Sequence, residues 1–409
     1  MKGPIPVNPK LDGQTDDRTR ENIIDSSTQV AHDSHDELHR GAVVMPIYQN
    51  SLFTFATYEE FDRASAGASD SFVYTRGNNP TVRQLEMRLA ALQGGEKARC
   101  FASGMAAIST AILANVRAGD HIICIDQVYG PTRELLTGFL TRYGVETTFV
   151  DGASLEAIQA AVRANTKLVY LESPTTMTFQ LQDLSACARL AKSIGAVTMI
   201  DNTWATPCLQ NPFEHGIDFV LHSMSKYIGG HSDIIGGVLI GSAENINRIN
   251  ASEYLLLGGI MTPHSASLAM RGLRTLPLRL EKQEQSGLTV ACHLESLPFV
   301  RKVNHPGLAS HPQHELARRQ MSGSSSLFSF ETDLPAEDMK AWADRLEYFR
   351  IGVSWGGHES LVTVGRLGPG YESVPGSLVR LYVGLENPQV LIEDIERASA
   401  QLPVEKSDK

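Results

Sequence analysis

Short apolar runs separated by helix-like segments fill the middle of the chain, from about residue 97 to residue 241. Segments with apolar residues three and four positions apart predict helices that cover a sheet, at 135–143, 155–164 and 184–194. Seven apolar runs predict strands, at 98–102, 121–126, 146–150, 167–172, 197–201, 217–222 and 236–240. This alternation predicts an α/β fold whose seven-stranded sheet is mostly parallel.

The pattern changes after about residue 262, where periodic apolar residues predict one long helix over 265–294. Strands predicted at 327–330 and 378–383 follow, so this part is expected to form a smaller α+β domain. The serine-rich stretch 322–326 runs directly into a strand, which favours a turn over a linker. We divide the chain into an N-terminal arm, a large domain and a C-terminal domain, at 1–68, 69–262 and 263–409.

Charge and cysteine content exclude several classes of protein. The chain has 409 residues and a net charge of -10, which argues against a nucleic-acid partner because phosphate binding needs clustered cations. Its apolar runs are too short to span a bilayer, so we expect no membrane association. Five scattered cysteines without a C-x-x-C pair predict neither disulfides nor a metal site. A cytoplasmic location is expected.

Polar residues follow several predicted strands, at the edge where α/β sheets bind ligands. Each has an ordinary explanation when taken alone. Ser103 and Gly104 could cap a helix, Tyr129 could be a rim aromatic, Asp201 could cap a turn, and Lys226 could be a solvated cation. Together they are the parts of a pyridoxal phosphate site. The full set comprises Ser103, Gly104, Met105, Tyr129, Glu172, Asp201, Ser223, Ser225 and Lys226.

Each part matches one group of that cofactor. The amides of Gly104 and Met105 and the hydroxyls of Ser223 and Ser225 suit the phosphate, as helix N-termini and hydroxyl donors do. Tyr129 would stack on the pyridine ring.

The two charged residues supply the chemistry. Asp201 would keep the pyridine nitrogen protonated, so that the ring withdraws electrons from the substrate. Lys226, in "HSMSKYIGGHSD", would bind the cofactor aldehyde through its amine and later remove the Cα proton of the substrate.

Two further clusters contain candidate residues. Arg76, close to Tyr74 in "FVYTRGNNPTV", suits a phosphate, although a surface cation is an equal alternative. Near the C-terminus, Ser354 lies in "SWGGHESL" and Arg380 in "LVRLYVGLE". Arg380 either grips a substrate carboxylate or pairs with Glu386.

These motifs resemble the pyridoxal phosphate enzymes of cysteine and methionine metabolism, which have the fold-type I, aspartate aminotransferase-like scaffold. The resemblance runs in order through "YTRGNNPT", "ASGMAAI", "QVYGPTRE", "IDNTWATP", "HSMSKYIGGHSD" and "SWGGHESL" to "RLYVGLE". It implies a homotetramer of catalytic dimers, with Tyr74 and Arg76 contacting the cofactor of the neighbouring subunit. It also implies substrate contacts from Tyr129, Ser354, Trp355 and Arg380, with Tyr129 as a second acid/base group.

Within this family, "DNTWA", "SWGG" and Pro131 resemble the bacterial cystathionine β-lyases. Thr175-Thr176-Met177 points the same way, because γ-acting relatives tend to have "TNP" where this chain has "TTM". Val353 and His358 depart from the β-lyase pattern, which has tyrosines there. We therefore expect β-cleavage of L-cystathionine to homocysteine, pyruvate and ammonia. The alternatives are γ-elimination or γ-replacement, as in methionine γ-lyase, cystathionine γ-synthase or O-acylhomoserine sulfhydrylase, and a regulatory protein with little turnover.

Overall fold

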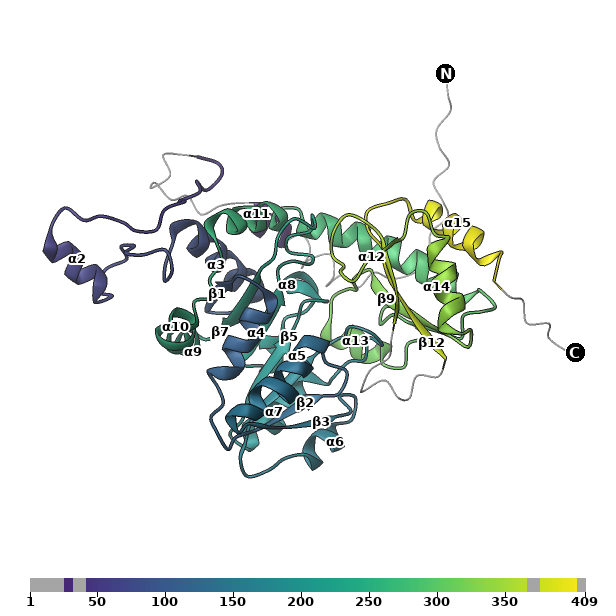
Figure 1. Ribbon diagram of the computed structural model, residues 1–409, viewed down its shortest axis with the longest axis horizontal. Helices are drawn as coiled ribbons and strands as arrows, with labels where there is room; N and C mark the ends of the chain where they lie inside the picture. The colour runs from purple at the N-terminus through teal and green to yellow at the C-terminus, as the bar shows by residue number, and fades with distance from the viewer. Residues whose placement is uncertain (1–25, 32–41, 366–375, 403–409) are drawn as a thin grey trace, which may run out of the picture.

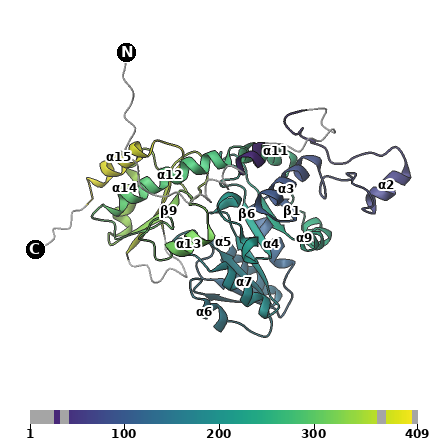
Figure 2. The same ribbon diagram turned by 180° about the vertical axis from the view of Figure 1, so that it is seen from behind.

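A computed structural model describes residues 26–31, 42–365 and 376–402. Two sheets organise the molecule, one in the large unit and one in the C-terminal unit (Figure 1). Figure 2 shows from behind that α12 (Leu276–Glu295) runs along the upper edge of the molecule toward α15 (Pro388–Ser399) of the C-terminal unit. The domain limits remain a prediction. The first 25 residues of the predicted arm and the last seven of the predicted C-terminal domain lie outside the described residues.

The first sheet has seven strands in the order β1-β7-β6-β5-β4-β2-β3. Five neighbouring strands run parallel, and β7 is antiparallel to both of its neighbours. The strands are β1 (Lys97–Phe101), β2 (His121–Ile125), β3 (Glu146–Val150), β4 (Thr166–Glu172), β5 (Val197–Asp201), β6 (Phe219–Ser223) and β7 (Gly237–Gly241). The predicted α/β fold with a mostly parallel sheet is confirmed.

Helices pack on this sheet through apolar faces. Contacts join α3 to β1, α4 to β6 and β7, and α7 to β4 and β5. The large unit contains α3 (Pro80–Gln93), α4 (Gly104–Leu113), α5 (Gly130–Glu134), α6 (Leu155–Ala160), α7 (Leu184–Ser193), α8 (Thr206–Leu209), η4 (Pro212–His215), α9 (Ala243–Ile249), η5 (Asn250–Tyr254) and α10 (Leu255–Leu257). Strands β2, β4, β5 and β6 therefore lie in a buried sheet that holds their C-terminal residues in fixed positions.

Two predicted helices of the large unit have different forms in the structure. The segment 135–143 is a π-turn, η2 (Leu135–Phe139), followed by a 3-10 turn, η3 (Leu140–Tyr143). Gly138 and Thr141 are poor helix formers, and the left-handed Gly144 ends the segment. The helix predicted over 155–164 ends at Ala160, and the amide of Arg163 instead donates to Thr166 Oγ1 at 2.8 Å.

The predicted long helix over 265–294 is two helices, α11 (Pro263–Leu273) and α12 (Leu276–Glu295). Pro277 causes the break, because its ring would clash with the carbonyl of Leu273 in a continuous helix. Helix α11 packs against α3 of the large unit, and α12 packs against the sheet of the C-terminal unit. The chain therefore passes from one unit to the other through α11 and α12.

The C-terminal unit has a five-stranded sheet in the order β10-β11-β12-β9-β8. Its strands are β8 (Lys302–Asn304), β9 (Leu327–Thr332), β10 (Arg350–Ile351), β11 (Leu361–Gly365) and β12 (Ser377–Tyr382), and its helices are α13 (His314–Gln320), α14 (Ala336–Asp344) and α15 (Pro388–Ser399). The predicted strands at 327–330 and 378–383 correspond to β9 and β12. As predicted, the serine-rich stretch 322–326 is non-regular and leads into β9.

Residues 42–65 form an arm that carries α2 (Tyr58–Ser65) away from the sheet (Figure 1). Large apolar side chains on this arm are exposed, among them Val43, Tyr58 and Phe61. Across the described ranges, every helix is too short or too polar to cross a membrane.

Candidate active site

A cavity of about 800 Å³ lies where several strands of the large sheet end and the C-terminal unit faces them. Most of the predicted site residues line it, although they come from distant parts of the sequence. They are Ser103, Gly104, Met105, Tyr129, Glu172, Asp201, Ser223, Ser225, Lys226, Ser354, Trp355 and Arg380. Tyr74 and Arg76 are not among the lining residues.

Lys226 follows β6 and lies inside this cavity. Its Nζ atom lies 5.6 Å from the centre of the Trp355 ring. Burial lowers the pKa of the Lys226 amine, and Arg380 lowers it further, whereas the carboxylate of Asp201 raises it. The result is a lysine that loses its proton more readily than an exposed one, as a nucleophile or general base must.

Asp201 ends β5 beside Glu172 at the end of β4, since the two residues pair across the sheet. Asp201 Oδ1 accepts hydrogen bonds from the Thr203 amide at 2.9 Å and from Thr203 Oγ1 at 2.5 Å. Burial raises the pKa of Asp201, while the bonds from Thr203 and the charge of Lys226 oppose that shift. The carboxylate is thus held in one orientation at the wall of the cavity.

The hydroxyl oxygen of Thr203 also accepts a hydrogen bond from the Ser223 amide at 2.8 Å. This residue therefore connects the ends of β5 and β6, and it lines the cavity. Sequence reasoning missed Thr203, although its place two residues after a strand that ends in aspartate was an available signal.

Glu172 holds the backbone of Tyr129 in place. Its Oε2 atom accepts from the Tyr129 amide at 2.8 Å. Burial raises the pKa of Glu172 well above its usual range, and the neighbouring Asp201 adds to the shift. Burial, followed by the charges of Asp201 and Glu172, also raises the pKa of Tyr129, so this phenol keeps its proton. Tyr129 is thereby a hydrogen-bond donor at the cavity wall.

The first turn of α4 closes another side of the cavity. Ser103 caps the helix and accepts from the Ala106 amide at 3.0 Å. A side chain at Gly237 would place its Cβ 2.3 Å from the Ser103 carbonyl oxygen, so β7 approaches this turn as closely as glycine allows. Helix N-terminal amides and the hydroxyls of Ser223 and Ser225 thus lie together, as a phosphate dianion requires.

Arg380 enters the cavity from β12. Its guanidinium donates to the Val353 carbonyl at 2.8 Å and lies 3.3 Å from Thr176 Oγ1. Glu386, the alternative partner, accepts two hydrogen bonds from Ser360, and within the described part of the chain no ion pair joins it to Arg380. The pairing of Arg380 with Glu386 is thus not seen among the described residues, and contact of Arg380 with a substrate carboxylate remains a prediction.

Tyr74 and Arg76 lie outside the cavity, on the side of the arm. Arg76 donates to the Leu255 carbonyl at 2.9 Å, and half of the Tyr74 surface is exposed. A role for them at the cavity of the same chain is not supported by this position, and contact with a second subunit remains a prediction. His358 also lies outside the lining residues, with its ring 3.4 Å from Glu359.

The chain matches the family model described as "Cys/Met metabolism PLP-dependent enzyme" over residues 26–400. It belongs to this family. The membership shows a pyridoxal phosphate cofactor, and the cavity fits it: a half-buried lysine, a half-buried carboxylate and a helix N-terminus surround a space of suitable size.

Curated relatives of the family are similar over most of their length. L-methionine gamma-lyase from Porphyromonas gingivalis is 40% identical over 381 residues, which cover 90% of this chain and 96% of that protein. Cystathionine gamma-lyase from Bacillus subtilis is 38% identical, with 88% and 94% covered. Cystathionine gamma-synthase from Mycobacterium tuberculosis is 37% identical, with 94% and 99% covered. These names agree with the γ-acting alternative better than with the predicted β-lyase.

Proposed function

We propose that this chain is a pyridoxal phosphate-dependent carbon–sulfur lyase that cleaves sulfur-containing amino acids at Cγ. The main support is the buried amine of Lys226, with its lowered pKa, inside the same cavity as Asp201 and Arg380. A lyase needs a base beside Cα, a stabiliser for the cofactor ring and a carboxylate clamp, and these three residues match those needs.

Pyridoxal phosphate, when bound, withdraws electron density from the bonds to the substrate Cα. Asp201 accepts the hydrogen bond of the ring nitrogen in this proposal, and Thr203 holds it in place. Lys226 binds the cofactor until substrate arrives, and then its free amine takes the Cα proton. Arg380 orients the substrate carboxylate, which aligns the Cα–H bond with the amine.

Cleavage at Cγ is supported by the relatives, whose printed names are γ-lyases and a γ-synthase. Val353 and Ile235 also line the cavity and are 86% and 69% exposed, and such apolar side chains suit the carbon chain of a thioether substrate. In this reaction protons leave Cα and Cβ, and the thiolate leaves Cγ and takes up one proton. The other proton is returned to Cγ of the four-carbon remainder, and hydrolysis of the resulting enamine gives 2-oxobutyrate and ammonia.

Cleavage of L-cystathionine at Cβ is the second candidate, and one observation favours it. Trp355, which matches the β-lyase motif "SWGG", lies against the Lys226 amine, with Tyr227 5.4 Å behind it. This reaction needs only the Cα proton to leave before the thiolate, and it yields homocysteine, pyruvate and ammonia.

Product analysis separates these candidates. Purified protein loaded with pyridoxal phosphate is incubated with L-methionine and, separately, with L-cystathionine, and the keto acid is identified. We expect 2-oxobutyrate, with methanethiol or cysteine as the thiol. Pyruvate with homocysteine as the main products would replace our proposal with the β-lyase. Cystathionine formed only from an acylated homoserine and cysteine would indicate a transferase, and no turnover of any substrate by loaded protein would overturn the lyase proposal.

The proposal includes a second copy of the chain at the site. The family resemblance implies a tetramer of catalytic dimers in which Tyr74 and Arg76 contact the neighbouring cofactor. Support comes from the exposed position of Tyr74 and from the exposed apolar residues of the arm, which are of the kind that subunit interfaces cover.

A further inference from the structure

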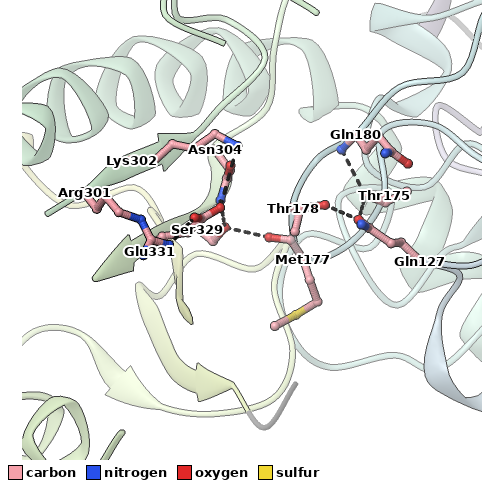
Figure 3. Close-up of polar contacts among 10 residues, drawn as sticks. All are labelled: Gln127, Thr175, Met177, Thr178, Gln180, Arg301, Lys302, Asn304, Ser329 and Glu331. Atoms are coloured by element: carbon pink, nitrogen blue, oxygen red, sulfur yellow. Dashed lines mark hydrogen bonds and ion pairs between the residues drawn. The ribbon is translucent and has the colours of Figure 1, made fainter. Parts of the chain in front are cut away.

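The segment 175–178, which includes Thr176 and Met177, follows β4 in the large unit. It contacts the C-terminal sheet beside Arg380. Within the large unit, the Thr175 amide donates to the Gln180 carbonyl at 2.9 Å, and the Gln180 amide donates to Thr175 Oγ1 at 3.0 Å. Thr178 and Thr175 both donate to Gln127 (Figure 3). These bonds define the shape of the segment, but they do not attach it to the sheet that contains Arg380.

Arg380 itself contacts Thr176 and Met177 at 3.3–3.7 Å, and Ser329 adds a shorter bond from the same sheet. Its hydroxyl donates to the Met177 carbonyl at 2.6 Å and accepts from the Asn304 amide group at 3.2 Å. Both Ser329 and Asn304 are completely buried. Since the Asn304 amide group supplies the proton of that second bond, the Ser329 proton is directed at Met177.

The C-terminal sheet keeps this hydroxyl next to Arg380. Ser329 pairs with Arg380 across β9 and β12, and Ser329 pairs with Asn304 across β9 and β8. Residues paired in this way share one face of a sheet. Ser329 therefore binds the Met177 carbonyl while its cross-strand neighbour contacts Thr176, the residue before.

A charged cluster fixes the other end of this row (Figure 3). Glu331 is buried and accepts from Asn304 at 3.1 Å and from Arg301 at 2.6 Å, and Lys302 lies 3.7 Å away. The bond to Glu331 thus orients the Asn304 side chain, so that its Nδ2 group also donates to the Ser329 hydroxyl. The chain of contacts continues from Glu331 through Asn304 and Ser329 to Met177.

We propose that Ser329 is a positioning residue, which through the Met177 carbonyl holds the 175–178 segment beside Arg380 in the arrangement that binds the substrate carboxylate. This inference rests on the proposed role of Arg380 in carboxylate binding. It predicts that loss of the Ser329 hydroxyl weakens the binding of amino acids that have a free carboxylate, without comparable weakening when that carboxylate is neutralised.

The test measures ligand binding by the change in cofactor absorbance of the loaded protein. L-Alanine is one ligand and L-alaninamide, which lacks the carboxylate charge, is the other. Neither has a sulfur leaving group, so failure of the carbon–sulfur lyase proposal would leave this measurement valid. Ser329→Ala is expected to raise the Kd of L-alanine between about 5-fold and 100-fold, the range for one buried hydrogen bond, and that of L-alaninamide less than about twofold.

Ser377→Ala is the matched control. Ser377 is also a buried serine of the same sheet, and its hydroxyl donates to the Leu334 carbonyl at 2.8 Å, away from Met177. It is expected to leave both dissociation constants unchanged. Unchanged binding of L-alanine to Ser329→Ala, or equal weakening of both ligands, would overturn the proposal. If Ser329→Ala does not fold, Asn304→Ala decides: we expect L-alanine to be weakened at least about threefold more than L-alaninamide, and equal changes would refute the inference.

Discussion

At the scale of single residues, burial and charge act in opposite directions on Lys226. Burial and Arg380 lower the pKa of its amine, whereas Asp201 raises it. Asp201 in turn depends on Thr203, which donates two hydrogen bonds to one carboxylate oxygen. The reactivity of the lysine is therefore a property of its surroundings as much as of the amine itself.

Lys226→Ala is expected to abolish covalent attachment of the cofactor and to lower turnover at least about a thousandfold, because both the nucleophile and the Cα base are lost. Borohydride reduction followed by peptide mapping checks the attachment, and a keto-acid assay checks turnover. The exposed Lys340 provides a control, since Lys340→Ala should retain both. Cofactor trapped on another lysine of the wild-type protein would contradict the assignment.

Buried histidines make the fold sensitive to acid. Burial lowers the pKa of His222 and of His305 to about 3, so each is neutral in the folded protein and protonated in the unfolded chain between that pH and about 6.5. Above pH 6.5 both histidines are neutral in the folded protein and in the unfolded chain, so they cost no stability. As the pH falls below 6.5, the unfolded chain takes up protons that the folded protein does not, and the free energy of unfolding decreases. At pH 5 each histidine is expected to cost about 2 kcal/mol of unfolding free energy.

Urea unfolding at several pH values measures this effect. The free energy of unfolding should fall between pH 6.5 and pH 5. His305→Phe should make that fall less steep, because up to about one proton fewer is taken up on unfolding. His264 is exposed, so His264→Gln should leave the slope unchanged. A His305→Phe protein with the wild-type slope would show that His305 does not contribute.

At the scale of elements, the cavity depends on how closely β7 approaches the start of α4. Gly237 leaves only enough space for a hydrogen atom beside the Ser103 carbonyl. Gly104 is similarly close to Ser223, since a Cβ there would lie 3.1 Å from the Ser223 Cβ. These approaches bring the first turn of α4 close to Ser223, where the cofactor phosphate is proposed to bind.

Gly237→Ala should push the first turn of α4 away from β7, because the added Cβ would overlap Ser103. We expect cofactor affinity to fall about tenfold or more, measured by equilibrium dialysis of pyridoxal phosphate, together with a lower unfolding midpoint. Gly138 has open space at its Cβ position, which makes Gly138→Ala the control with wild-type affinity. Unchanged affinity in Gly237→Ala would argue against phosphate binding at this turn.

At the scale of the whole molecule, the C-terminal unit completes the cavity of the large unit. Arg380, Ser354 and Trp355 reach the cavity from one unit, and Lys226 and Asp201 from the other. The proposed assembly extends this sharing to a second subunit, because Arg76 and Tyr74 lie outside the cavity of their own chain.

A mixing experiment tests that sharing. Arg76→Ala and Lys226→Ala proteins are expected to lose most of their activity when each is pure. When they are unfolded together and refolded, a mixed dimer has one site with an intact Lys226 from one chain and an intact Arg76 from the other. We expect up to about a quarter of wild-type activity to return, as random pairing with one restored site in each mixed dimer predicts. Hybrid dimers without activity would contradict a shared site.

The amino-acid pattern alone predicted all seven strands of the large sheet, and most of them are buried apolar runs. Most of the residues that it predicted for the site do line the cavity, because strand ends in such a sheet meet at one edge. Strands β8 and β10, of three and two residues, are too short for so distinct a pattern. Strand β11 and the break between α11 and α12 were not predicted.

Only the tertiary structure decided which distant residues meet. Strand pairing sets Ser329 beside Arg380, and the packing of two units brings both to Met177, which is 152 positions from Ser329 in the sequence. It also placed Thr203 under Asp201 and excluded Tyr74 from its own cavity. Local sequence determines which segments form helices and strands, whereas contacts over long sequence separations depend on register and packing, which no single segment contains.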